Sequence, residues 1–136
     1  MSHNDFQPNG GLPVAPSAIS SNGQSPIAPG VLKNCPVPRA LETSEIAEVI
    51  EELKRAAELA KLAGFDGVEI HAANDYLLEQ FLSDQANVRT DKYGGNVANR
   101  ARLIIEVTEA VASIWQGSRV GIRIPQLAKT HDHFAR

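Results

Sequence analysis

The chain has 136 residues, of which 43% are apolar, and a net charge of −3. This size fits one domain, and the charge balance gives no support to a basic surface for nucleic acids or for anionic membranes. The single cysteine, Cys35, excludes an internal disulfide bond. No apolar run reaches the roughly 18 residues of a membrane-spanning helix, and the N-terminus lacks a secretory signal pattern, so we expect a soluble, cytoplasmic protein.

The first forty residues are rich in residue types that interrupt regular structure. They hold seven of the eight prolines and four of the ten glycines. Proline removes a backbone donor and glycine permits positive φ, so long helices are not expected here. The segment is predicted to be a loop with short strands, best at residues 12–19 and 31–32. Composition favours a disordered tail, and the alternative is an ordered excursion that packs on a larger body.

A long amphipathic helix is predicted to follow this segment. From Ile46 to Ala63, apolar residues recur at spacings that place them on one face of a helix. Thr43 is a suitable N-cap for this helix. Gly64 stands where a left-handed C-terminal cap is expected.

Two short β-branched runs, at residues 67–71 and 120–124, are predicted to be strands, and Pro125 stops the second. Each follows a predicted helix after a short link. Alternating helices and short strands indicate an α/β fold built from parallel β/α units. In a β/α barrel, the long loops that follow the strands carry the chemistry.

The long link between these strands contains further predicted elements. We expect a short helix over residues 76–82 and a polar loop over residues 83–95. Asn96 can cap a second long helix, which Gly117 is expected to end. The chain thus divides into a Pro/Gly-rich excursion (1–40), a β/α part (41–124) and a tail (125–136).

Candidate catalytic residues gather just beyond the first predicted strand. His71 and Asn74 can donate hydrogen bonds to a carbonyl oxygen, and the hydroxyl of Tyr76 can deliver a proton. Together they suit the polarisation of a carbonyl group and the protonation of a neighbouring carbon. The alternative is a loop whose polar groups satisfy its own backbone.

Arg123 is the charged residue of the second predicted strand. A guanidinium group there must be paired or must face a ligand. The structural alternative is an ion pair with Glu69 on the neighbouring strand, and the spacing does not decide between the two. His131 and His133 lie in the tail, where solvated histidines are expected, so no metal site is predicted.

Several of these residues belong to longer runs that resemble one family. The run from Ala63 to Asn74 resembles the old yellow enzyme family of flavin oxidoreductases. The resemblance covers about residues 2–124. Its other segments are residues 76–78, 80–82, 87, 89–91, 93–95, 99–100 and 120–123, together with residues 13–19, which resemble the excursion after the third barrel strand.

The resemblance implies an FMN-containing (β/α)8 TIM barrel that takes hydride from NAD(P)H. The reduced flavin then passes hydride to the β-carbon of a small α,β-unsaturated carbonyl compound. By resemblance, His71 and Asn74 hold the substrate carbonyl oxygen and Tyr76 protonates the α-carbon. Arg123 lies against the flavin and stabilises negative charge on the reduced ring.

The chain also departs from the family pattern. Asp75 stands where the family usually has glycine. A whole barrel needs roughly 250 residues, so the resemblance implies a partial barrel of strands four and five with their helices. The flavin contacts of the first three strands and the phosphate site after strands seven and eight are then lacking. The alternative function is a non-catalytic truncated or split fragment that docks on complementary barrel segments or on a second copy.

Overall fold

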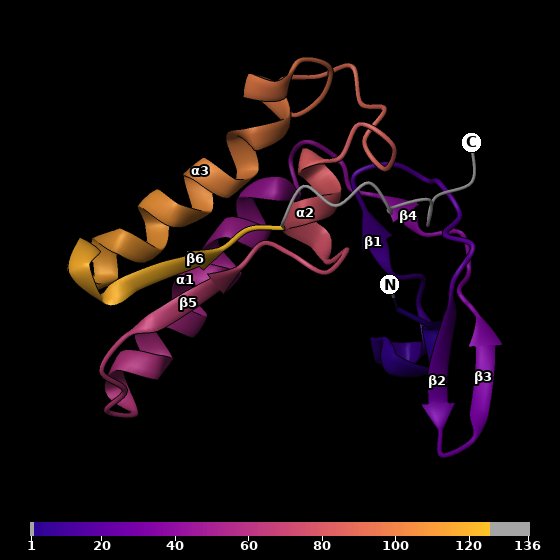
Figure 1. Ribbon diagram of the computed structural model, residues 1–136, viewed down its shortest axis with the longest axis horizontal. Helices are drawn as coiled ribbons and strands as arrows, with labels where there is room; N and C mark the ends of the chain where they lie inside the picture. The colour runs from indigo at the N-terminus through magenta and orange to yellow at the C-terminus, as the bar shows by residue number, and fades with distance from the viewer. Residues whose placement is uncertain (1, 126–136) are drawn as a thin grey trace.

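The computed structural model describes residues 2–125 of the chain. Up to residue 40 it contains two 3-10 helices and four strands: η1 (Asn4–Phe6), η2 (Pro8–Gly10), β1 (Val14–Ala15), β2 (Gln24–Ala28), β3 (Val31–Asn34) and β4 (Arg39–Ala40). Helices and strands then alternate: α1 (Ile46–Leu62), β5 (Val68–His71), α2 (Leu77–Leu82), α3 (Val97–Ile114), η3 (Gly117–Arg119) and β6 (Val120–Arg123). Figure 1 shows the β2–β3 hairpin extending away from the long helices.

The N-terminal segment is folded, so the interpretation of it as a disordered tail is wrong. β2 and β3 form an antiparallel hairpin, and Gly30 in its turn has a φ of +75°. β1 and β4 pair in parallel. The sequence pattern fails to indicate β2 because Pro26 lacks an amide donor, and the pairing is irregular between Pro26 and Ala28. The three-part division of the chain stays a prediction.

The helix α1 is confirmed, but its predicted N-cap is wrong. It begins at Ile46, and Glu45 precedes it without a side-chain capping bond. The Thr43 hydroxyl instead donates to the carboxylate of Asp91. A turn closed by the Glu45 N–H on the Glu42 carbonyl at 3.0 Å separates Thr43 from the helix. At the other end, Gly64 has a φ of +85°, as a left-handed cap requires.

The second long helix, α3, has the predicted start but a different end. The side chain of Asn96 accepts a hydrogen bond from the Asn99 N–H at 2.9 Å, which confirms its capping role. The helix ends at Ile114, and Gly117 opens the 3-10 helix η3 instead. The cause is Trp115, whose extended backbone lets its indole N–H donate to the Ala57 carbonyl of α1 at 3.0 Å.

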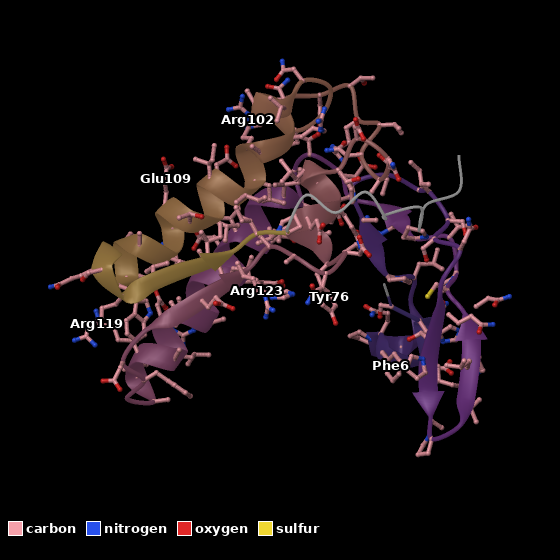
Figure 2. The ribbon with its side chains drawn as sticks, in the orientation of Figure 1. Phe6, Tyr76, Arg102, Glu109, Arg119 and Arg123 are labelled. Atoms are coloured by element: carbon pink, nitrogen blue, oxygen red, sulfur yellow. The ribbon has the colours of Figure 1, made fainter. Side chains whose placement is uncertain are left out.

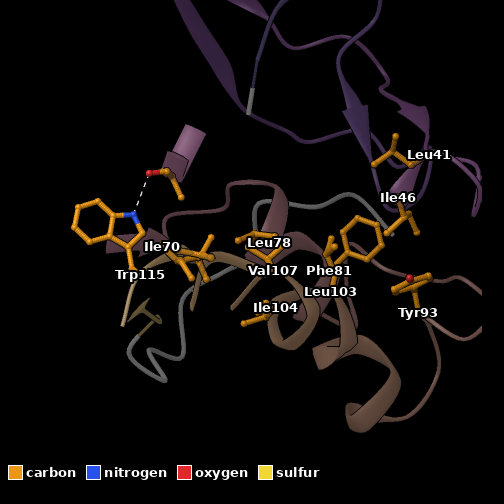
Figure 3. Close-up of a cluster of buried hydrophobic side chains, with 13 residues drawn as sticks. Leu41, Ile46, Ile70, Leu78, Phe81, Tyr93, Leu103, Ile104, Val107 and Trp115 are labelled. Carbon is orange, nitrogen blue, oxygen red and sulfur yellow. Dashed lines mark hydrogen bonds between the residues drawn. The ribbon is translucent and has the colours of Figure 1, made fainter. Parts of the chain in front are cut away.

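One hydrophobic core joins the helices to the strands. Figure 3 shows side chains from α1, α2, α3 and β5 meeting in it. Ile46, Phe81, Leu103 and Val107 have no measurable exposure, and burying each such side chain contributes about 2 kcal/mol. No helix within residues 2–125 is long and apolar enough to cross a membrane.

The parallel pair of β5 and β6 sets the geometry of the candidate site. Val68 pairs with Val120, and His71 pairs with Arg123. Val68 and Val120 pack against the core. Because side chains alternate along a strand, His71 and Arg123 lie together on the opposite face. The predicted α/β organisation in parallel units is therefore confirmed.

Candidate active site

The chain turns sharply just after β5, where the candidate residues lie. The Ala72 N–H donates to the Arg123 carbonyl at 2.9 Å, which extends the pairing of β5 and β6 by one bond. Asn74 and Asp75 then adopt left-handed conformations, with φ values of 57° and 58°. Glycine adopts such a backbone most readily, and asparagine and aspartate tolerate it better than other residues do. This conformation explains why a glycine suits the position of Asp75.

The structure brings two of the predicted residues into contact. The rings of His71 and Tyr76 meet edge to face, with their centroids 5.3 Å apart. The Nε2 atom of His71 is buried and has no hydrogen-bond partner among residues 2–125. Buried polar atoms are nearly always paired, so an unpaired one at a candidate site suits a ligand atom. Tyr76 is 53% exposed beside it.

Asn74 belongs to the same turn but not to this contact. It lies exposed three residues beyond His71. Its side chain makes no hydrogen bond to any described part of the chain. A ligand reaching His71 therefore meets an amide whose donors are not committed elsewhere.

Arg123 is exposed at the end of β6. No ion pair or side-chain hydrogen bond within residues 2–125 involves its guanidinium group, and the alternative pairing with Glu69 does not form. Figure 2 shows Arg123 and Tyr76 on the same side of the molecule. An exposed cation therefore lies on the face that carries His71, where it can meet an anionic group of a ligand.

A cavity of about 360 Å³ adjoins the turn. Tyr76 and Gln80 line one side of it, and Val14, Ser17 and Cys35 line the side formed by the N-terminal segment. The local sequence pattern does not predict that the N-terminal segment and the turn line the same cavity. The one indication in the sequence is the resemblance of residues 13–19 to a family segment.

A second polar cluster, which the sequence analysis missed, is centred on Arg89. Its guanidinium donates to the carbonyls of Pro16, at 3.0 Å, and Leu41. It also donates to the Thr43 hydroxyl at 3.1 Å and to Asp91. These bonds, together with those from Thr43 and from the Tyr93 N–H, hold the pKa of the Asp91 carboxyl well below its usual range. We call these residues the Arg89 junction, which ties three distant segments together.

Tyr93 differs from Tyr76 in being buried. Burial, followed by a 2.8 Å hydrogen bond to Glu106, raises the pKa of Tyr93 to about 12. Its proton is therefore committed to a neighbour inside the fold. Tyr76, in contrast, is 53% exposed beside His71.

Comparison with known proteins identifies the family. A model described as the NADH:flavin oxidoreductase / NADH oxidase family matches residues 4–134. The chain belongs to this family. The family description names flavin and NADH, in agreement with the FMN and NAD(P)H that the resemblance implied.

Relatives in this family include plant reductases. Two from Oryza sativa subsp. japonica are similar to the chain. 12-Oxophytodienoate reductase 7 is 45% identical over 125 residues, which are 90% of this chain and 32% of the relative. 12-Oxophytodienoate reductase 1 is 46% identical over 135 residues, which are 98% of this chain and 34% of the relative. The chain thus spans about a third of the length of these flavin oxidoreductases.

Solved structures of flavin oxidoreductases have the same fold over this region. Morphinone reductase in complex with tetrahydroNAD is 45% identical, with a TM-score of 0.88 over 98% of this chain and 38% of that chain. An old yellow enzyme homologue from Zymomonas mobilis is 43% identical, with a TM-score of 0.80 over 85% of this chain and 32% of that chain. These neighbours are TIM barrels, and the chain matches part of one.

The two tail histidines named in the sequence analysis, His131 and His133, lie outside the described residues.

Proposed function

We propose that this chain carries the carbonyl-binding and proton-donating part of an FMN-dependent ene-reductase. The observation that supports this function best is the unpaired, buried Nε2 of His71 beside the half-exposed ring of Tyr76. Arg123 lies on the same sheet face with no partner within residues 2–125. These groups can receive a substrate carbonyl and a flavin without first breaking a bond to any residue from 2 to 125.

Each residue has a distinct role in this proposal. His71 and Asn74 donate hydrogen bonds to the carbonyl oxygen of a small enone, where negative charge develops during reduction. Tyr76 protonates the α-carbon. Arg123 would hold the isoalloxazine ring of FMN, which would supply the hydride transfer from NAD(P)H to the β-carbon.

The parallel pair and its helices have a defined place in this proposal. We assign β5 and β6 to strands four and five of a (β/α)8 barrel, and α1 and α3 to its helices three and four. The long link after β5, which carries the candidate residues, supports this assignment, because such loops hold the chemistry of these barrels. A cytoplasmic location stays a prediction.

The experiment is a flavin titration of the purified chain, followed by NAD(P)H oxidation with cyclohexenone as acceptor. We expect a bound flavin spectrum and enone-dependent turnover, both weakened in Arg123→Ala. The matched control is Arg55→Ala, because Arg55 lies on α1 and pairs with Glu58 at 2.8 Å, away from the site. A chain that retains no FMN and oxidises no NAD(P)H would contradict the proposal for this chain by itself.

A second candidate is a non-catalytic fragment that docks on complementary barrel segments or on a second copy. The observation that favours it is the isolation of β5 and β6, which pair only with each other in the described part of the chain. Ile122 and Ile124 are also 42% and 63% exposed. The outer edges of a two-stranded sheet have unpaired backbone groups, which attract further strands. If this candidate is right, light scattering will show either a dimer or a complex with added barrel segments. A chain that stays monomeric and binds no added segment would exclude it.

A further inference from the structure

The helix α2 begins directly at the candidate site and returns two side chains toward it. Tyr76 is the N-cap of α2 and makes no capping bond with its own side chain. Glu79 and Gln80 lie in the first turn and a half of the helix, and they are 6% and 9% exposed. Glutamate and glutamine are rarely so buried, which calls for an explanation.

Both side chains bind backbone groups of Asp75, which lies between Asn74 and Tyr76. The Asp75 N–H donates to Oε2 of Glu79 at 2.7 Å. Nε2 of Gln80 donates to the Asp75 carbonyl at 2.6 Å. The two backbone groups of Asp75 are therefore each held by a side chain from one helical turn, an arrangement that we call the Asp75 clamp.

The clamp acts on a backbone that would otherwise relax. Asn74 and Asp75 are consecutive non-glycine residues at positive φ, a conformation that L-residues avoid. Such a conformation persists when surrounding contacts over-determine it. A rotation about the backbone of Asp75 would swing Asn74 and Tyr76 relative to each other, since they flank it.

Core packing alone does not explain why Glu79 and Gln80 occupy these buried positions. Within residues 2–125, the Asp75 N–H is the only donor that forms a hydrogen bond with the Glu79 side chain. Oε1 of Gln80 is buried with no partner within the same residues. A buried carboxylate and an unpaired amide oxygen destabilise a core, whereas apolar residues at these positions would not. Local departures of this kind concentrate at functional sites.

We propose that Glu79 and Gln80 are positioning residues, which set the relative aim of Asn74 and Tyr76 through the Asp75 clamp. Their effect on the reaction rests on the proposed function. The clamp itself belongs to the backbone of this chain and can be tested without flavin.

Four variants separate positioning from packing. Glu79→Ala removes the acceptor, and Gln80→Glu removes the donor with almost no change in shape. Glu79→Gln keeps an acceptor oxygen and serves as the conservative rescue. Glu109→Gln is the control, because Glu109 is exposed on α3 and its side chain makes no hydrogen bond or ion pair within the described residues.

The first measurement is NMR of the full chain without flavin, following amide hydrogen exchange and the nuclear Overhauser effect between the His71 and Tyr76 rings. In Glu79→Ala and Gln80→Glu we expect that effect to weaken, and in Glu79→Ala we expect Asp75 amide exchange about tenfold faster or more. Amides of α1 and α3 should keep their rates, and Glu79→Gln should resemble the unmodified chain. An unchanged ring contact, or an equal acceleration in α1 and α3, would overturn the proposal.

The second measurement is enone reduction by the flavin-loaded chain. We expect Glu79→Ala to lower kcat about tenfold with little change in the KM for the enone, because the proton donor is misaimed rather than removed. An altered ring contact with unchanged kcat would also overturn the positioning role. A chain that binds no FMN contradicts the proposed function alone, and the ring contact then decides the clamp.

Discussion

Two polar clusters in this chain differ in how their arginines are bound. Arg89 donates to two carbonyls, a hydroxyl and a carboxylate, and its side chain is 10% exposed. Arg123 is exposed and makes no such bond with its guanidinium within residues 2–125. The difference indicates two functions for one residue type: a fully paired arginine stabilises the fold, whereas one with no such bond to the described residues is available to a ligand.

The largest effect expected at the unpaired cluster follows Tyr76→Phe in the flavin-loaded protein, with the remaining barrel segments supplied from a relative if the chain alone retains no FMN. Reoxidation of the reduced flavin by an enone should slow by about 10²–10⁴-fold, because the α-carbon loses its general acid. Flavin reduction by NAD(P)H needs no such proton and should be nearly unchanged. Rapid mixing separates the two half-reactions, and equal impairment of both would contradict the role of Tyr76.

The paired cluster should respond in stability instead. Arg89→Ala leaves Asp91 and the carbonyls of Pro16 and Leu41 without their donor, so the free energy of unfolding should fall by about 3 kcal/mol. Arg123→Ala removes no guanidinium bond to residues 2–125 and should change that free energy by less than about 0.5 kcal/mol. Urea denaturation of both variants makes the measurement. Equal losses would contradict the distinction between the two arginines.

The same junction predicts a pH dependence of stability. Because the pKa of Asp91 is lowered in the folded chain, its stabilising effect is complete above its unfolded pKa of about 4 and is lost as the pH falls toward the folded pKa. Urea midpoints measured from pH 7 to pH 2 should therefore decline more steeply below pH 4 in the unmodified chain than in Asp91→Asn. Parallel curves would show that Asp91 is not a source of acid sensitivity.

The sequence predicted the β/α alternation well because periodicity reports burial directly. The spacing from Ile46 to Ala63 and the two β-branched runs sufficed for α1, β5 and β6. Parallel pairing then places His71 and Arg123 on one face. The sequence does not show whether Glu69 pairs with Arg123, because the spacing of residues does not determine side-chain conformation.

The Arg89 junction was not predictable for a different reason. Its partners Pro16, Leu41 and Thr43 lie 73, 48 and 46 residues away in the chain. Local patterns carry no information on such contacts, so the sequence alone predicts Thr43 to be the cap of the nearest helix. The β2–β3 hairpin was likewise hidden, since Pro26 weakens the local strand signal.

The smallest expected effect concerns the strained turn of the candidate site. Asp75→Gly places at φ 58° the residue that adopts this conformation most readily, while the glycine also adds freedom to the unfolded chain. The two effects oppose each other, so we expect the free energy of unfolding to change by no more than about 1 kcal/mol. Gly64→Ala is the matched control, because it forces an alanine to the φ of +85° at the end of α1, and should lose about 1 kcal/mol. Urea denaturation of the two variants gives the comparison. A clear loss of stability in Asp75→Gly would show that contacts of the aspartate, rather than the Asp75 clamp and the backbone alone, hold the turn beside Tyr76 in place.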